Sequence, residues 1–164
     1  MNNTEHFKDY EFMCPCCGVE KMDNRIISML ETLRTALNAK SIVITSGYRC
    51  EKRDREVGGI IGMHNKGGAC DIIAYKKSGE RYSAFTIAEQ AEKIGFTGIG
   101  IIDSTACHVD IRGTIPYSNN HWFGNEQNGE TYTTFSGMGE KIENVSHETL
   151  CPHCGKKIKI ERGE

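Results

Sequence analysis

Residues 64–71 read His-Asn-Lys-Gly-Gly-Ala-Cys-Asp, and this stretch decides how the fold and the chemistry of the chain are interpreted. It begins with an imidazole and ends with a carboxylate inside residues 69–75, an apolar run that predicts a strand. Further along, His108 stands before Val109 and Asp110 in a second short run of strand type. Catalytic zinc sites take three ligands of the His, Asp or Glu type and keep a fourth position for water. The residue types are therefore those of a catalytic zinc site, but the spacing alone also fits histidines that are exposed or only hydrogen-bonded.

The segments around this stretch predict an α+β domain. Apolar residues at helical spacing predict a helix over residues 23–39, with Asp23 as its N-cap, and a second over 83–94 that ends at Gly95. Strands are expected at residues 41–45, 69–75, 99–102 and 107–111, and the glycine-rich, charged residues 47–64 are expected to form a long loop. This order predicts helices packed on a mainly antiparallel sheet.

The domain boundaries are expected after an N-terminal segment and before a C-terminal extension. Residues 1–22 are polar and irregular, residues 23–124 hold the predicted helices and strands, and residues 125–164 are expected to pack on the same domain. Residues 113–146 are rich in Asn, Gly and Thr, and only Trp122-Phe123 predicts an anchor there. A chain of 164 residues is long enough for one domain with a real core.

Composition excludes several classes of function. The formal net charge of −2 offers no basic surface for nucleic acid. No apolar run approaches the ~18 residues that a bilayer-spanning helix needs. The N-terminus lacks the basic-then-apolar order of a secretory signal, so we expect synthesis in the cytoplasm and release by another route. The sequence carries no information on oligomeric state.

Four short motifs occur in a fixed order, and together they are more specific than the His and Asp spacing alone. They are Ser-Gly-Tyr-Arg at 46–49, Val-Gly-Gly at 57–59, the stretch 64–71, and His-Val-Asp-Ile-Arg at 108–112. This order resembles the family of zinc D-Ala-D-Ala carboxypeptidases and related phage and bacterial peptidoglycan peptidases. That family shares its fold with the signalling domain of hedgehog proteins. The resemblance covers residues 7–122.

The resemblance implies roles for four residues. His64, Asp71 and His108 match the family's zinc ligands, and Arg49 matches the arginine beside the substrate's carbonyl or carboxylate. The residue types agree with this chemistry, because zinc polarises a carbonyl and lowers the pKa of a bound water towards ~7. A guanidinium that always stays charged is suited to an oxyanion or a terminal carboxylate.

The general base is where the sequence departs from its relatives. Many of them carry Glu or Asp three residues before the third ligand, and this chain has Thr105 there. Asp110 lies two residues after His108, so on a strand both side chains leave the same face. Asp103 lies five residues before His108, across a turn. We expect Asp110 to be the base or the residue that orients a ligand, with Asp103 as the alternative.

Eight cysteines point to a second, structural zinc ion. Two segments fit the pattern C-P-x-C-G, and in a reducing compartment closely spaced cysteines are more often metal ligands than disulfides. The expected ligands of one closed, four-thiolate site are Cys14, Cys17, Cys151 and Cys154. Disulfides, separate sites or a metal shared with a partner remain open. Cys70 and Cys107 are expected to face the core.

The sequence thus predicts a zinc-dependent hydrolase that cuts amide bonds in peptidoglycan stem peptides, as a D-Ala-D-Ala carboxypeptidase or an endolysin-type endopeptidase. A phage lysis system that releases the enzyme to the cell wall would agree with the N-terminus. Two alternatives are a catalytically inactive, zinc-stabilised binding module of the same fold, which Thr105 favours, and a zinc-ribbon interaction protein. The bond that is cut depends on the shape of the pocket.

Overall fold

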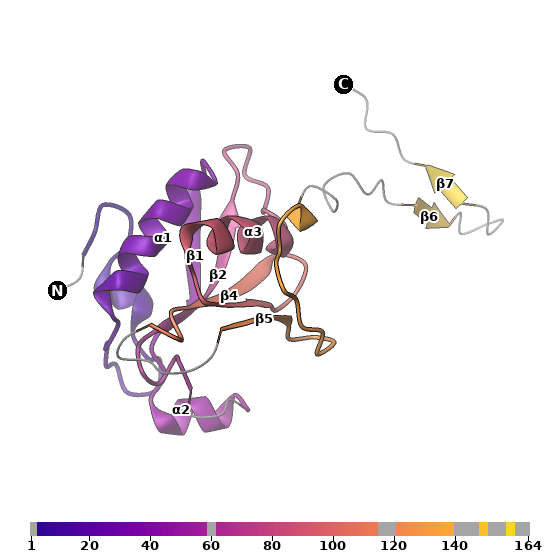
Figure 1. The fold of residues 1–164 in the computed structure, drawn as a ribbon. Helices are drawn as coiled ribbons and strands as arrows, with labels where there is room; N and C mark the ends of the chain where they lie inside the picture. The colour runs from indigo at the N-terminus through magenta and orange to yellow at the C-terminus, as the bar shows by residue number, and fades with distance from the viewer. Residues whose placement is uncertain (1–2, 59–61, 115–120, 140–147, 151–156, 160–164) are drawn as a thin grey trace.

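The computed structural model describes residues 3–58, 62–114, 121–139, 148–150 and 157–159 (Figure 1). Its elements follow in the order η1 (Asp9–Phe12, a 3₁₀ turn), α1 (Asn24–Ala36), β1 (Ser41–Ser46), α2 (Glu51–Glu56), β2 (Ala69–Tyr75), α3 (Ala84–Ile94), β3 (Gly98–Ile101), β4 (Ala106–Asp110), β5 (Trp122–Asn125), β6 (Glu148–Leu150) and β7 (Lys157–Lys159). Among these described residues, no helix is both long and apolar enough to cross a membrane.

One five-stranded sheet, in the order β1-β2-β4-β3-β5, forms the centre of the domain. Its pairs are antiparallel except for β5, which lies parallel to β3. Helix α3 packs on β3 and β4 and contacts α1, while α2 lies apart from both near the lower end of Figure 1. The predicted α+β class with a mainly antiparallel sheet is confirmed. Strands β6 and β7 form a separate antiparallel pair.

The two long helices begin and end as their sequences predict. Asp23 caps α1 by accepting a hydrogen bond from the backbone N–H of Arg25, and Ser83 caps α3 in the same way through Thr86. Gly95 ends α3 with a φ of 101°, a left-handed conformation that glycine adopts without a steric penalty. The buried apolar residues of both helices belong to one hydrophobic cluster.

Residues 47–64 are not one long loop, because they contain helix α2. All six residues of this helix are charged, so it lacks the apolar periodicity that would predict it. Its exposed side chains instead pair along the helix: Arg55 with Glu51 at 3.5 Å and Lys52 with Glu56 at 4.0 Å. Within this helix only Asp54 is buried, and it forms an ion pair with Arg49.

The hydrophobic core draws on the chain well outside the predicted central segment. Phe7 and Phe12 from the N-terminal segment and Phe135 from the region after β5 are all fully buried in the same cluster. The predicted anchor at Trp122-Phe123 is the beginning of β5, which adds the fifth strand to the sheet. The N-terminal segment is thus packed against the part of the molecule that holds the candidate site.

Candidate active site

Strand register brings two of the three candidate ligands side by side. Asp71 on β2 is paired directly with His108 on β4, and cross-strand neighbours project from the same face of a sheet. His64 comes from the turn that precedes β2. That turn requires glycine at Gly67, where φ is +76° and a side chain would collide with the carbonyl of Lys21. Gly67 thus shapes the turn that carries His64.

The donor atoms of these three residues converge on one point. His64 Nε2 lies 3.2 Å from Asp71 Oδ1 and 3.2 Å from His108 Nδ1, and His108 Nδ1 lies 2.9 Å from Asp71 Oδ1. Ligand atoms about 2.0–2.1 Å from a tetrahedral zinc ion stand roughly 3.3 Å from one another. The observed triangle therefore has the size of one face of a tetrahedral zinc site.

The opposite nitrogen of each imidazole is held by a hydrogen-bond acceptor. His64 Nδ1 lies 2.8 Å from the carbonyl oxygen of Gly47, and His108 Nε2 lies 3.0 Å from Asp110 Oδ2. An N–H directed at such an acceptor fixes the tautomer and leaves the lone pair of the other nitrogen for a metal ion. Both histidines are oriented as metal-binding histidines are.

The charges around the triangle are strongly coupled. Burial raises the pKa of the Asp71 carboxyl, but hydrogen bonds from His108 and His64 hold that pKa well below its usual range. Burial lowers the pKa of His108, whereas the carboxylates of Asp110 and Asp71 raise it to about 9. Without a metal ion, a protonated His108 is therefore stabilised between the carboxylates of Asp71 and Asp110. A divalent cation bound by Asp71 and His108 would compete with this proton.

Arg49 reaches the same site from the segment between β1 and α2. Its Nε lies 3.1 Å from Asp54 Oδ1, and its Nη1 lies 4.0 Å from Asp71 Oδ2. The backbone of Arg49 is tied to the turn of the metal ligands, because its N–H donates to the carbonyl of His64 and its carbonyl accepts from Asn65 Nδ2. The guanidinium therefore stands beside the candidate metal centre on a fixed backbone.

A cavity of about 440 Å³ opens over these residues. The described side chains and glycines that line it are Arg49, Asp54, Gly58, Gly62, Met63, His64, Asp71, His108, Arg112, Trp122 and Glu126. A larger hollow of about 540 Å³ lies near the N-terminus, around His6 and Glu31, and touches none of the candidate ligands. The smaller cavity is the one that combines a metal-binding triangle with an arginine.

Residues 5–110, more than half of the chain, match the protein family described as Peptidase M15. This chain belongs to that family. Peptidases of this family are zinc-dependent hydrolases, so the predicted family and the class of reaction are confirmed. A comparison with curated proteins gives no match.

The two carboxylates predicted as a base in this M15 peptidase are both engaged elsewhere. Asp110 is fully buried, and its oxygens accept hydrogen bonds from His108 and from the guanidinium of Arg112. Asp103 accepts backbone N–H groups of Thr105 and Ala106, which lower its pKa against the effect of burial, and it does not line the described part of the cavity. The base role of each remains a prediction.

The predicted four-cysteine site is only partly within the described residues. Cys14 and Cys17 do lie together, and the third member of their group is Cys50, which lies outside both C-P-x-C-G segments. Cys151 and Cys154 lie outside the described residues. Cys70 and Cys107 are fully buried, as predicted, and burial raises the pKa of the Cys107 thiol well above its usual range.

The sequence alone assigns no role to three residues of the M15 site. Asp54 pairs with Arg49 from inside a short, charged helix, and Glu126 lines the cavity from the poorly patterned region after β5. Arg112 belongs to the motif at 108–112, yet its contacts with Asp110 and with the ring of Trp122, at 5.2 Å, appear only in three dimensions. The motif was visible in the sequence, but its connections were not.

Proposed function

We propose that this M15 peptidase hydrolyses amide bonds in peptidoglycan stem peptides, with zinc held by His64, Asp71 and His108. The observation that carries the proposal is the triangle of donor atoms, 2.9–3.2 Å apart, at a cavity that Arg49 also lines. The motifs at 46–49 and 108–112, which resemble those of D-Ala-D-Ala carboxypeptidases, support this class of substrate. A zinc ion bound there would supply Lewis-acid polarisation of the scissile carbonyl and a water of lowered pKa.

Arg49 is the residue that would hold the substrate. Its guanidinium is permanently charged and offers two parallel N–H groups, which match a carboxylate or a developing oxyanion. Asp54 is 1 % exposed and its Oδ1 lies 3.1 Å from Arg49 Nε, so this ion pair restrains the guanidinium at the cavity. A stem peptide bearing a free carboxylate or a carbonyl near the metal would therefore be aligned by Arg49.

Glu126 is proposed as the proton acceptor. Its Oε1 lies 2.8 Å from the place where a Cβ of Gly100 would stand, and Gly100 is the direct cross-strand partner of His108. Cross-strand partners share a face of the sheet, so the Glu126 carboxylate lies over the same face as the metal ligands. Of the described carboxylates that line the cavity, Asp71 is a candidate ligand and Asp54 is paired with Arg49. Glu126 is the remaining one.

Asp110 is proposed as the residue that orients His108 rather than as the base. Its carboxylate is 0 % exposed and bridges His108 Nε2 and the guanidinium of Arg112. A general base must reach the attacking water, and a carboxylate whose oxygens are already bound behind the ligand does not. This position suits the second of the two roles that the sequence predicts for Asp110.

The test is hydrolysis of purified bacterial cell walls and of a synthetic stem pentapeptide by the zinc-loaded chain. Release of D-Ala indicates a carboxypeptidase, and release of internal amines indicates an endopeptidase. His108→Ala is expected to abolish both. His6→Ala is the matched control. His6 also contacts a carboxylate, Glu31, at 2.7 Å, but it does not line the cavity at His64, Asp71 and His108. No turnover by a zinc-loaded, folded chain on either substrate would favour the inactive binding module.

Glu126 is tested separately by Glu126→Gln. We expect kcat to fall by about 10²–10⁴-fold, the usual contribution of a general base, while the zinc content stays unchanged. Glu130→Gln is the control, since Glu130 is exposed and its carboxylate binds the hydroxyl of Tyr132. Equal kcat values in the two variants would assign the proton to another group.

A further inference from the structure

The N-terminal segment forms a tight turn around its first cysteine. The N–H of Cys14 donates to the carbonyl of Val19 at 2.9 Å, and the N–H of Gly18 donates back to the carbonyl of Cys14 at 2.8 Å. Gly18 has a φ of +66°, which closes the turn. Such a turn holds Cys14 and Cys17 on the same side of the backbone, as metal-binding C-x-x-C turns do.

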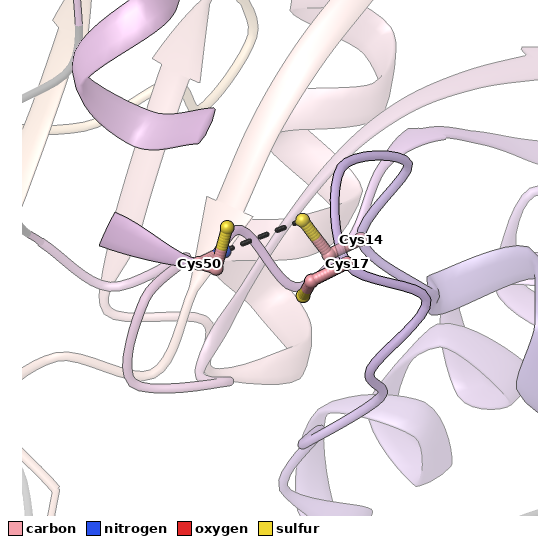
Figure 2. A group of neighbouring side chains, drawn as sticks. All are labelled: Cys14, Cys17 and Cys50. Carbon is pink, nitrogen blue, oxygen red and sulfur yellow. Dashed lines mark hydrogen bonds between the residues drawn. The ribbon is translucent and has the colours of Figure 1, made fainter. Parts of the chain in front are cut away.

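A second segment, distant in sequence, is packed directly against this turn. The N–H of Tyr48 donates to the carbonyl of Phe12 at 2.9 Å, and a Cβ at Gly47 would stand only 2.6 Å from the backbone of Phe12. The N–H of Cys50 donates to the sulfur of Cys14 at 3.4 Å (Figure 2). The backbone contacts thus bring the Cys50 thiol to the Cys14–Cys17 turn.

The three sulfur atoms are close enough to share one ion. The Sγ atoms of Cys14, Cys17 and Cys50 all lie within 4.8 Å of one another, and none of the three forms a disulfide. Zinc–sulfur bonds of about 2.3 Å at tetrahedral angles separate two sulfurs by roughly 3.8 Å. Figure 2 shows the thiols between the turn and the segment of Cys50, with the Cys50 N–H directed at Cys14 Sγ. A backbone N–H directed at sulfur favours the thiolate, the form that binds metal.

We infer that Cys14, Cys17 and Cys50 bind one zinc-type divalent ion through three thiolates, at a site separate from the His64, Asp71 and His108 triangle. On binding, each thiol releases its proton to solvent as the sulfur–metal bond forms. The ion joins the N-terminal turn to the segment between β1 and α2, two parts of the chain that share no strand pairing. This site differs from the arrangement predicted from sequence, because Cys50 is a ligand in it.

The experiment uses the full chain loaded with Co²⁺, which reports thiolate ligands through a charge-transfer band in the near ultraviolet. The wild-type chain is expected to show this band. Cys50→Ser is expected to weaken it and to lower tight zinc by about one ion per chain, measured by elemental analysis. Cys17→Ser is measured in the same way and is expected to have the same effect. Because Cys17 is exposed, its loss leaves the core intact.

Two further variants separate this inference from the proposed function. His64→Ala with His108→Ala should retain the thiolate band while losing the other ion, whether or not the chain is an active peptidase. Cys151→Ser with Cys154→Ser tests the ligand set predicted from sequence. A full band in Cys50→Ser overturns the inference, as does a wild-type band that depends only on Cys151 and Cys154. A disulfide among the three cysteines in the freshly purified chain, detected by mass spectrometry without reductant, also overturns it.

Discussion

The described residues include two candidate metal-binding groups, and these are built in different ways. In the His64, Asp71 and His108 group, two ligands are cross-strand partners on β2 and β4, so the hydrogen-bond ladder of the sheet fixes their separation. In the cysteine group, the N-terminal turn and the segment before α2 meet through packing and single backbone hydrogen bonds. A strand ladder positions ligands before any ion binds. We therefore expect the first group to hold its geometry without metal and the second to depend on it.

The largest expected effect is on the sheet-borne group, through Asp71→Asn. The substitution removes the only negative charge among the three ligands, so we expect loss of this ion and no detectable peptide hydrolysis. The cobalt–thiolate band of the cysteine group should be unchanged, because Asp71 is not a member of that group. Loss of both ions in a folded Asp71→Asn chain would mean that the two groups are coupled, contrary to the comparison.

The second effect concerns the residue behind the ligand. Asp110→Asn keeps the shape of the side chain but removes the charge that faces His108 and Arg112. Loss of such an orienting carboxylate typically costs 10–100-fold in metal affinity or activity, and we expect a fall of about that size in zinc affinity. Zinc titration against a competing chelator measures it. Unchanged zinc affinity together with loss of kcat would instead support Asp110 as the general base.

The same difference in construction explains which site residues the sequence could predict. Asp71 and His108 were predicted as ligands through the resemblance of their motifs, and the register of β2 and β4 then places them opposite each other on one face of the sheet. Arg49 was predicted through its motif, but its partner Asp54 was not, because α2 has no apolar stripe. Cys50 was visible beside Arg49, yet nothing in the spacing of the chain shows that Gly47 lies against Phe12.

Fold prediction failed where pairing is distant or where charge replaces periodicity. The long helices and four of the strands followed from caps and apolar runs, which are local properties. Strand β5 pairs in parallel with β3 across more than 20 residues, and its short sequence, Trp-Phe-Gly-Asn, is not a strand pattern on its own. Glu126 directly follows β5, so the failure to predict that strand also concealed a cavity carboxylate.

The third prediction concerns the support of Arg49. Asp54→Asn removes the buried charge 3.1 Å from the guanidinium, so we expect KM to rise about 10-fold, equivalent to 1.4 kcal/mol of substrate binding, with a smaller change in kcat. Glu51→Gln is the matched control in the same helix, since Glu51 is exposed and pairs only with Arg55 at 3.5 Å among the contacts described for it. Equal KM values in the two variants would argue that Arg49 is positioned by its backbone alone.

The smallest effect is a pH dependence of the metal-free chain, and it tests whether the sheet-borne group is assembled without an ion. The pKa of His108 is about 9 in the folded chain against an ordinary 6.5, so its stabilising proton is fully bound below pH 6.5. That contribution is lost as the pH rises from 6.5 through 9. Asp71 and Asp110 have lowered pKa values, so their contributions are lost only in acid, outside this window.

His108→Gln isolates the contribution of this histidine, because cysteines and other groups that titrate between pH 6.5 and 9 are the same in both chains. In chelator-treated samples, the Tm of the wild-type chain relative to that of His108→Gln should fall across this window by on the order of a few °C. A parallel pH dependence of the two Tm values would show that the carboxylates of Asp71 and Asp110 do not hold His108 in the metal-free chain. In that case the sheet-borne group would need its ion as much as the cysteine group does, and the contrast between a preformed and a metal-assembled site would fail.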